Sequence, residues 1–365
     1  MTGTSIDGID AALVEITGEG LAMQARFLKG TSAGLGDLGL HLRSFANNSP
    51  AIAGEVAQMA LDLGKLHVDV LLDLLGEQTP DLITLHGQTV FHKPPLSWQM
   101  INPWPVVKEF GAEVIYDLRG SDLIFGGQGA PITPLADFIL FRDFSKERCI
   151  VNFGGFINYT YIPSGMGFAG SEEVRLSRWL EGVRGCDVTP CNQLLDYISR
   201  QFLGMPYDVG GLVAATGVVD EEALNALIAT LTSNDRTLRS LGTGDEAFAW
   251  VKDFQKRLSP ADLLRTACRG IATRLRAALV DNGDFEITGA GGGVKNQTLM
   301  AEVTMMTGKE FQTTDNYGVP AHFREAIEIA ILGDLAAQGY PVSLPQITGR
   351  TDGTTTGCKI AKTIS

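Results

Sequence analysis

The feature that most constrains the fold is a plan that occurs twice: a polar turn with glycine, leading into a strand of alternating apolar residues. The first copy opens the chain, where residues 2–8 run into an alternating segment at 10–16. The second consists of a strand at 149–153, a turn at Gly154-Gly155 and an alternating strand at 157–162. Glycine lets backbone approach an anion closely, and hydroxyl and amide groups can donate to it. The repeat predicts two phosphate-binding hairpins, although an ordinary polar turn accounts equally well for the first copy alone.

Bulk composition narrows the class of protein. A chain of 365 residues is longer than one hydrophobic core usually organises, so two domains with a cleft between them are expected. The net charge of −13 argues against binding to nucleic acid or to an anionic membrane. The five cysteines lack the paired spacing of a metal site, and no signal peptide or membrane-spanning run is evident, so we expect a cytoplasmic protein with reduced thiols.

Polar residues follow several predicted strands. A helix is expected at 52–76, then a buried strand at 82–85 that ends in His86-Gly87-Gln88-Thr89, and another at 113–116 that ends in Asp117-Leu118-Arg119. Open α/β sheets bind ligands at the carboxyl ends of their strands. These two segments are therefore candidate ligand contacts.

A third candidate site lies near the end of the chain. A helix is expected from Ser259-Pro260 to the Asn282-Gly283 turn, followed by a strand at 285–288, a glycine run at 289–293 and a helix containing Leu299. A strand, a glycine loop and a helix amino end together favour an anion or nucleotide site. The loop fits neither the dinucleotide fingerprint nor the P-loop pattern.

Taken in order, these segments resemble the anhydro-N-acetylmuramic acid kinases of the actin-like sugar-kinase superfamily. Gly126-Gly127-Gln128-Gly129-Ala130-Pro131 is identical to a family motif. The other matching segments are 2–10, 86–89, 117–122, 152–158, 207–211, 291–296 and 325–326.

The resemblance implies an α/β, two-domain actin-like ATPase (ribonuclease H-like) fold with an interdomain cleft. It places the first domain at 1–130 and 338–365 and the second at 131–337. It also implies a reaction in which water opens a 1,6-anhydro sugar while ATP phosphorylates the freed 6-hydroxyl, for recycling of the cell wall. ATP and Mg²⁺ would be required, the partners would be the sugar and ATP without nucleic acid or membrane, and the resemblance leaves room for a homodimer.

Roles carry over by position in the motifs. Asp187 matches the catalytic base that activates water; the competing interpretation is an Asp that caps the helix starting near Asn192. Arg119 suits the lactyl carboxylate of muramic acid, with an ion pair to Asp117 or Asp122 as its alternative. The implied sugar contacts are His86, Arg119, Gln128, Asn192 and Glu325. The implied nucleotide contacts are Gly3, Thr4, Ser5, Asp7, Gly8, Asn152, Gly154, Gly155, Asn158, Gly291, Gly292, Gly293 and Asn296, with Asp7 also holding the magnesium ion.

The chain departs from the family pattern in three places. Thr189 and Cys191 stand where the family has glycine, which predicts a narrower sugar subsite and leaves another anhydro sugar, such as levoglucosan, as an alternative substrate. The segment 165–184 is longer than usual and is either a lid or a surface insertion. Family members carry a strand before the first phosphate loop, so we expect a start further upstream. A sugar or nucleotide sensor without turnover is the alternative from another class.

Overall fold

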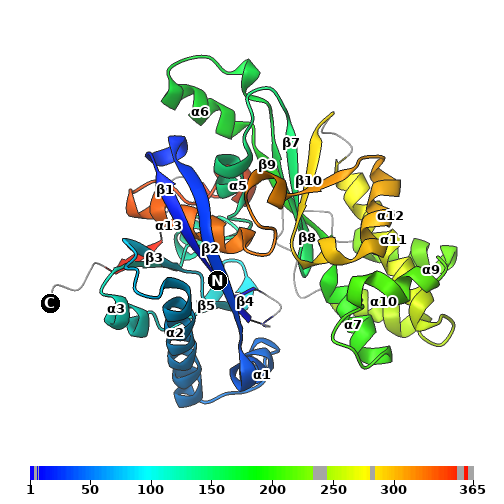
Figure 1. Cartoon of the computed structure of the whole chain (residues 1–365). Coiled ribbons are helices and arrows are strands. Elements are labelled where there is room, and N and C mark those ends of the chain that lie inside the picture. Colours follow the sequence, from blue (N-terminus) through cyan, green and yellow to red (C-terminus); the bar gives the residue numbers. More distant parts are fainter. Residues whose placement is uncertain (4–5, 7, 233–244, 280–283, 352–356, 361–365) are drawn as a thin grey trace. The chain divides into compact units, whose positions relative to one another are not determined.

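The computed structural model describes all residues except 4, 5, 7, 233–244, 280–283, 352–356 and 361–365. Within this part the chain is mixed α/β and divides into two units (Figure 1). Unit 1 comprises Met1–Phe141, Phe168–Glu181 and Gly318–Ser365, and unit 2 comprises Arg142–Gly167 and Gly182–Tyr317. The α/β class expected from the sequence is confirmed.

Unit 1 is built on short sheets covered by helices. A long antiparallel hairpin joins β1 (Gly8–Thr17) to β2 (Gln24–Gly34), and a second hairpin joins β4 (Gln88–Lys93) to β5 (Leu96–Met100). In a separate sheet, β3 (Leu82–Leu85) pairs in parallel with β6 (Glu113–Tyr116), which pairs antiparallel with β12 (Cys358–Ile360). The helices are α1 (Gly36–Ala46), α2 (Ala53–Leu75), α3 (Trp104–Phe110), α4 (Gly120–Ile124), α5 (Pro134–Phe141), α6 (Glu172–Glu181), α13 (Arg324–Ala337) and α14 (Pro345–Thr348), with a 3₁₀ turn η1 (Gly20–Ala22).

A buried ion cluster fixes helix α13 to helix α5. The guanidinium of Arg324 is 2% exposed and donates from Nη2 to both carboxylate oxygens of Asp137 at 2.7 Å. Its Nε lies 2.8 Å from Oε1 of Glu328, whose pKa burial raises well above its usual value. A neutral acid beside the Asp137–Arg324 pair leaves one net ion pair in the core, where an unmatched charge would be costly.

This cluster bears on the predicted domain boundaries. Residues 131–141 and 318–337 pack with unit 1, whereas the sequence reading put both in the second domain. Figure 1 shows α13 beside the β1–β2 hairpin, and it also packs on β3 and α5. Helix α13 contacts apolar and charged residues of elements that are far from it in sequence. The order of the motifs along the chain does not reveal such contacts.

The segment 165–184 adds a helix to unit 1. Its Trp179, on α6, is 4% exposed and meets Phe138 of α5 edge to face with ring centroids 5.4 Å apart. Gln346 also donates from Nε2 to the carbonyl of Leu180 at 2.9 Å. The buried Trp179 and this hydrogen bond therefore fix α6 to unit 1.

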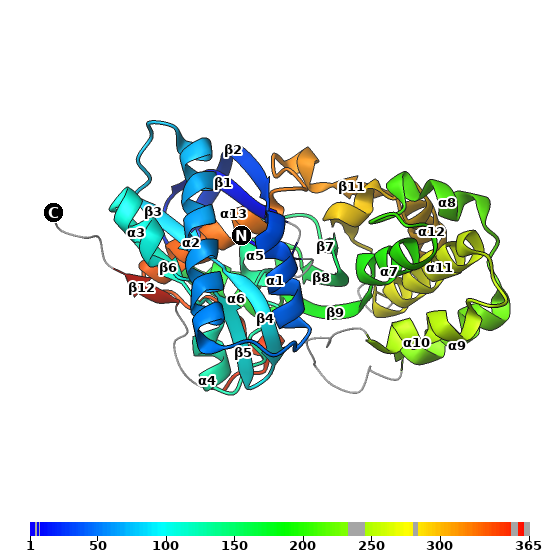
Figure 2. The ribbon, with the colours of Figure 1, turned by 90° about the horizontal axis from the view of Figure 1, so that it is seen from below.

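Unit 2 is one five-stranded sheet with helices on one side (Figure 2). The strand order is β11-β10-β7-β8-β9, with β10 parallel to β7 and to β11. The strands are β7 (Arg148–Phe153), β8 (Phe156–Ile162), β9 (Arg184–Pro190), β10 (Glu286–Ala290) and β11 (Phe311–Thr313). The helices are α7 (Asn192–Phe202), α8 (Leu212–Thr216), α9 (Glu221–Thr232), α10 (Asp245–Phe254), α11 (Pro260–Leu279) and α12 (Gln297–Thr307), with 3₁₀ turns η2 (Gly165–Gly167), η3 (Val209–Gly211), η4 (Gly292–Lys295) and η5 (Thr314–Tyr317).

Alternation along the strands gives the sheet of unit 2 two faces, one of which packs against the helices of the unit. Val151, Phe153 and Ile157 enter the core that α7, α11 and α12 cover. Asn152 and Asn158, offset by one residue, therefore lie on the opposite face of the sheet. Ile150 and Ile162 lie on the same face as these asparagines and are fully buried, so that face combines polar and apolar side chains.

Most predicted elements are confirmed within a few residues. The helix expected at 52–76 is α2, and the strands expected at 10–16, 82–85, 113–116, 149–153, 157–162 and 285–288 are β1, β3, β6, β7, β8 and β10. Ser259 caps α11 as expected, since its Oγ accepts from the Asp262 amide at 3.2 Å. The Asn282-Gly283 turn lies outside the described residues.

Candidate active site

The first polar loop is fixed to the His86-Gly87-Gln88-Thr89 segment. Thr2 donates from Oγ1 to the Gly87 carbonyl at 2.7 Å, and Gln88 donates from Nε2 to the Gly3 carbonyl at 3.0 Å. A Cβ on Gly8 would lie 2.8 Å from the Ala33 carbonyl oxygen, so glycine there permits the pairing of β1 with β2. Thr4, Ser5 and Asp7, predicted to hold phosphate and magnesium, lie outside the described residues.

Buried His86 and half-buried Arg119 form a hydrogen-bonded pair at the carboxyl ends of β3 and β6. Arg119 donates from Nε to Nε2 of His86 at 3.1 Å and from Nη1 to the Gly129 carbonyl at 2.6 Å. The other ring nitrogen, Nδ1, lies 2.9 Å from the Gly87 carbonyl. Burial, together with the positive charge of Arg119, lowers the pKa of His86 to about 3, so the ring is neutral at physiological pH.

Asp122 organises the loop that contains Gln128. Its carboxylate is fully buried and accepts from the Gly129 amide at 2.7 Å and from the Thr348 hydroxyl at 2.7 Å. The backbone amide of Gln128 donates to the Thr348 carbonyl at 2.9 Å. Gln128 itself is half-buried. The other motif acid, Asp117, accepts from the Gly120 amide at 3.0 Å. Asp117 and Asp122 therefore each accept a hydrogen bond from a backbone amide, a role that the sequence alone did not indicate.

Glu325 is half-buried near the start of α13 and close to the first loop. Burial lowers the pKa of the Met1 amine to about 6, although the negative charges of Asp10 and Glu325 act to raise it. The neighbouring Arg324 is locked to Asp137. The backbone that carries Glu325 is therefore fixed by the buried ion cluster.

In unit 2 the pairing register brings three predicted site residues into one row. Asn152 of β7 lies opposite Asn158 of β8, and Asn158 lies opposite Asp187 of β9. Directly opposed residues of antiparallel strands point to the same face, with Cβ atoms about 5 Å apart. Asp187 is thus on the face of the sheet opposite the helix-covered core, beside the second glycine hairpin.

The alternative role for Asp187, as a helix cap, is wrong. Asp187 lies within β9, and Cys191 occupies the N-cap position of α7. The first amides of α7 donate to the hairpin turn instead: Cys191 to the Gly155 carbonyl at 2.8 Å and Asn192 to the Gly154 carbonyl at 3.1 Å.

The second hairpin and the later glycine loop come together around two asparagines. A Cβ on Gly291 would lie 2.6 Å from Oδ1 of Asn152, and one on Gly293 would lie 3.0 Å from Oδ1 of Asn192. Asn192 also donates from Nδ2 to the Phe153 carbonyl at 3.0 Å. Only glycine allows this approach, so the later loop lies against Asn152, a predicted nucleotide contact, and Asn192, a predicted sugar contact.

Asn296 serves as a helix cap, a role that the sequence reading missed. Its Oδ1 accepts from the Leu299 amide at 2.9 Å at the start of α12. Gly211, with φ of +72°, presses against it so closely that a Cβ would lie 2.0 Å from Oδ1. Asp208 in turn accepts from the amides of Val213 and Ala214, both at 2.9 Å. The motif at 207–211 therefore packs against Asn296, the residue that ends the glycine loop and caps α12.

Comparison with known proteins agrees with the arrangement of these motifs. A family model described as anhydro-N-acetylmuramic acid kinase matches residues 1–362. The chain belongs to the anhydro-N-acetylmuramic acid kinase family.

Curated relatives carry the same description. The protein from Bordetella petrii is 33% identical over 96% of this chain and 92% of its own length. Those from Bordetella pertussis and Gloeobacter violaceus are 32% and 31% identical, each over 96% of this chain and over 91% and 94% of their own lengths. The expected membership in this family is confirmed.

Among solved structures, component A of (R)-2-hydroxyglutaryl-CoA dehydratase from Acidaminococcus fermentans aligns with a TM-score of 0.42 and 11% identity, over 90% of this chain and 99% of its own. The family assignment rests on the sequence and not on this likeness.

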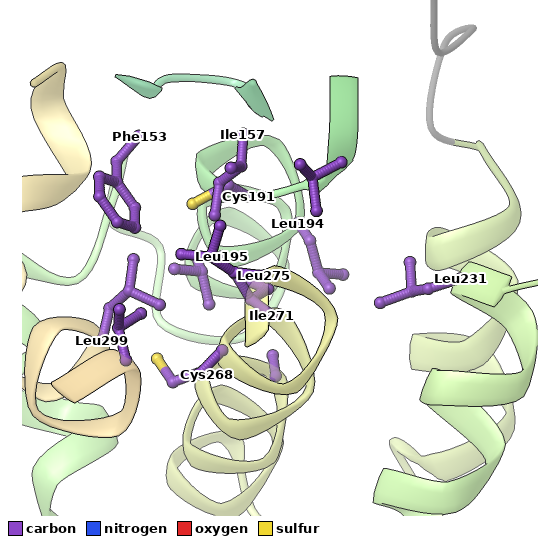
Figure 3. Packing of buried hydrophobic residues seen from close by; sticks show 14 of the residues in the cluster. Phe153, Ile157, Cys191, Leu194, Leu195, Leu231, Cys268, Ile271, Leu275 and Leu299 are labelled. Atoms are coloured by element: carbon purple, nitrogen blue, oxygen red, sulfur yellow. The ribbon is translucent and has the colours of Figure 1, made fainter. Parts of the chain in front are cut away.

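The substituted loop after Asp187 turns its side chains inward. Cys191 is fully buried in the core of unit 2, among Ile157, Leu194 and Leu195 (Figure 3). Its φ is −129°, so the backbone does not need the left-handed region that glycine would allow. Thr189 is 1% exposed. The expectation that these two residues narrow a ligand subsite is therefore not supported by their orientation.

Two observations concern metal and membrane. The described residues contain no cluster of three or more His, Cys, Asp or Glu side chains that could hold a metal ion. Magnesium, which keeps water and phosphate oxygens as ligands, needs only one or two carboxylates from a protein, so a single Asp7 fits its chemistry. In the part of the chain that the structure describes, no helix is long and apolar enough to cross a membrane.

Proposed function

We propose that this chain opens 1,6-anhydro-N-acetylmuramic acid with water and phosphorylates the freed 6-hydroxyl with ATP, giving N-acetylmuramic acid 6-phosphate for cell-wall recycling. The observation that carries the proposal is the row of Asn152, Asn158 and Asp187 on one face of the sheet of unit 2. A base beside a phosphate-binding hairpin can act on water close to the group that receives phosphate.

Asp187 is the general base. It takes a proton from the water that attacks C1 of the sugar, on the face opposite the departing oxygen. The C1–O6 bond breaks, and O6 receives the γ-phosphoryl group while ADP leaves. The fixed amides and asparagines of the hairpins provide dipoles for the charge that develops on the transferred group.

Binding roles follow from the same assignment. The triphosphate contacts are the glycine turns at Gly3–Gly8 and Gly154-Gly155, with Thr4, Ser5, Asn152 and Asn158. The later loop, Gly291–Gly293 with Asn296, carries the adenosine. Mg²⁺, held by Asp7, would neutralise charge on the β- and γ-phosphates. Arg119 binds the lactyl carboxylate, and Gln128, Asn192 and Glu325 orient the sugar.

The compartment is proposed to be the cytoplasm. All five cysteines are free thiols in the structure, as expected in a reducing compartment. ATP is also available there as a substrate.

The inward orientation of Cys191 and Thr189 favours the muramic sugar over levoglucosan. The argument for a different sugar depended on these side chains entering the subsite, and both are buried instead. The lactyl carboxylate also gives Arg119 a partner of matching charge and shape, which levoglucosan lacks.

ADP release tests the function. The protein is incubated with ATP and Mg²⁺, and with anhydro-N-acetylmuramic acid, levoglucosan or no sugar. We expect ADP only with the muramic sugar. Release with levoglucosan alone would change the substrate, and tight nucleotide or sugar binding without ADP release would favour the sensor. Sugar-independent release would remove the kinase assignment.

A further inference from the structure

His86 has no ring nitrogen left for a ligand. Nδ1 faces the Gly87 carbonyl, which can only accept, so this nitrogen carries the proton and donates at 2.9 Å. Nε2 then presents its lone pair to Nε–H of Arg119 at 3.1 Å. Two fixed partners determine the tautomer, and the ring is 4% exposed. The predicted direct contact between His86 and the sugar has no available atom.

The same contacts fix the plane of the Arg119 guanidinium. Nε is held by His86, and Nη1 by the Gly129 carbonyl at 2.6 Å. Two acceptors on different nitrogens of a planar group define its orientation. A guanidinium recognises a carboxylate through a planar fork, so its affinity for that ligand depends on this orientation.

The pair belongs to a longer hydrogen-bonded chain through unit 1. The Gly87 carbonyl accepts from both His86 and the Thr2 hydroxyl, and the Gly129 amide donates to Asp122 at 2.7 Å. Three motifs that are far apart in sequence are therefore joined through one imidazole.

We propose that His86 is a positioning residue: a neutral acceptor that sets the plane of the Arg119 guanidinium for the carboxylate of the sugar, without touching the sugar itself. This inference rests on the proposed function, because it takes a carboxylate-bearing sugar as the ligand of Arg119. The low pKa of His86 is consistent with it, since a protonated ring could not accept from arginine.

Two amide substitutions separate this role from a direct contact. In His86→Gln the side-chain oxygen reaches the place of Nε2 and can accept from Arg119. In His86→Asn the amide ends one bond earlier and reaches only the Gly87 carbonyl. We expect the sugar KM of His86→Gln to stay within about threefold of wild type. We expect that of His86→Asn to rise about tenfold or more, as for loss of a charge-assisted hydrogen bond.

Both changes are repeated in an Arg119→Leu background, with circular dichroism as a check of folding. If His86 acts through Arg119, the Gln and Asn variants have the same sugar KM in that background. Additive effects of the two positions, or equal effects of Gln and Asn with Arg119 present, would overturn the proposal.

A second readout is the pH dependence of the sugar KM. The profile of wild type and of His86→Gln should coincide between pH 5.5 and 8.5, because the ring does not titrate there. A step near pH 6.5 that disappears in His86→Gln would contradict the proposal. Failure of the function itself looks different, since wild-type protein would then release no sugar-dependent ADP.

Discussion

At the scale of single residues, the resemblance to the family points to Asp187 as the base, but only the strand register shows on which face of the sheet its side chain lies. The pairing shifts between Ile157 and Asn158, so Val188 is an extra residue in β9. Without this bulge, Asp187 would oppose Tyr159 and turn toward the core, because a one-residue slip moves every side chain to the other face. A bulge of this kind has no signature in a single sequence.

Cys191 is the residue at which the sequence-based expectation and the structure differ most. We predict that Cys191→Gly, which restores the family residue, lowers the free energy of unfolding by about 1–2 kcal/mol, because it removes a buried side chain and adds backbone freedom. The sugar KM should stay within about twofold. Urea unfolding and steady-state kinetics measure both; a fivefold change in sugar KM with unchanged stability would return Cys191 to the subsite.

At the scale of elements, strands and helices were predictable because their apolar periods are regular, as in α2 and β7. The roles of the motifs that connect these elements were not predictable from the sequence. Asn296 lies in a motif that implies nucleotide contact, yet its side chain caps α12, and Gly211 reaches it across 85 residues of chain. Such packing depends on backbone conformation at Gly211, with φ of +72°, and on no local pattern.

We predict that Gly211→Ala raises the KM for ATP about five- to tenfold. A methyl group there would displace Asn296, and loss of a helix cap costs about 1 kcal/mol while the glycine loop shifts with it. Gly204→Ala is the matched control: φ is +64°, but nothing lies within 4 Å of the added Cβ. If both variants changed the ATP KM equally, backbone strain and not the contact with Asn296 would be responsible.

At the scale of the whole molecule, the number of units was predictable from length and from the repeated plan, but their boundaries were not. The chain passes between the units at 141–142, 167–168, 181–182 and 317–318. Helices α5, α6 and α13 join unit 1 through Asp137, Trp179 and Arg324, whose partners are distant in sequence. Motif order carries no information about such contacts.

Global stability should fall in mild acid because unit 1 buries neutral histidines. Burial lowers the pKa of His67 to about 3, whereas an unfolded histidine titrates near 6.5. The unfolded state then binds a proton that the folded state does not, so stability is retained above about pH 6.5 and lost as pH falls below it.

For His67 alone, the loss between pH 7 and pH 5 is about 2 kcal/mol. We predict that His67→Leu reduces the pH dependence of the unfolding free energy by this amount, measured by urea unfolding at both pH values. The exposed His41→Leu should leave it unchanged. An identical pH dependence in wild type and His67→Leu would show that His67 is protonated in the folded protein.

The most direct test of the account is the turnover of Asp187→Asn with anhydro-N-acetylmuramic acid, ATP and Mg²⁺, beside Asp253→Asn, an exposed carboxylate of α10 in the same unit. Loss of a general base should lower kcat by about 10²- to 10⁴-fold with little change in the KM for ATP, and the control should behave as wild type. An Asp187→Asn protein that still turns over within threefold of wild type would contradict the account.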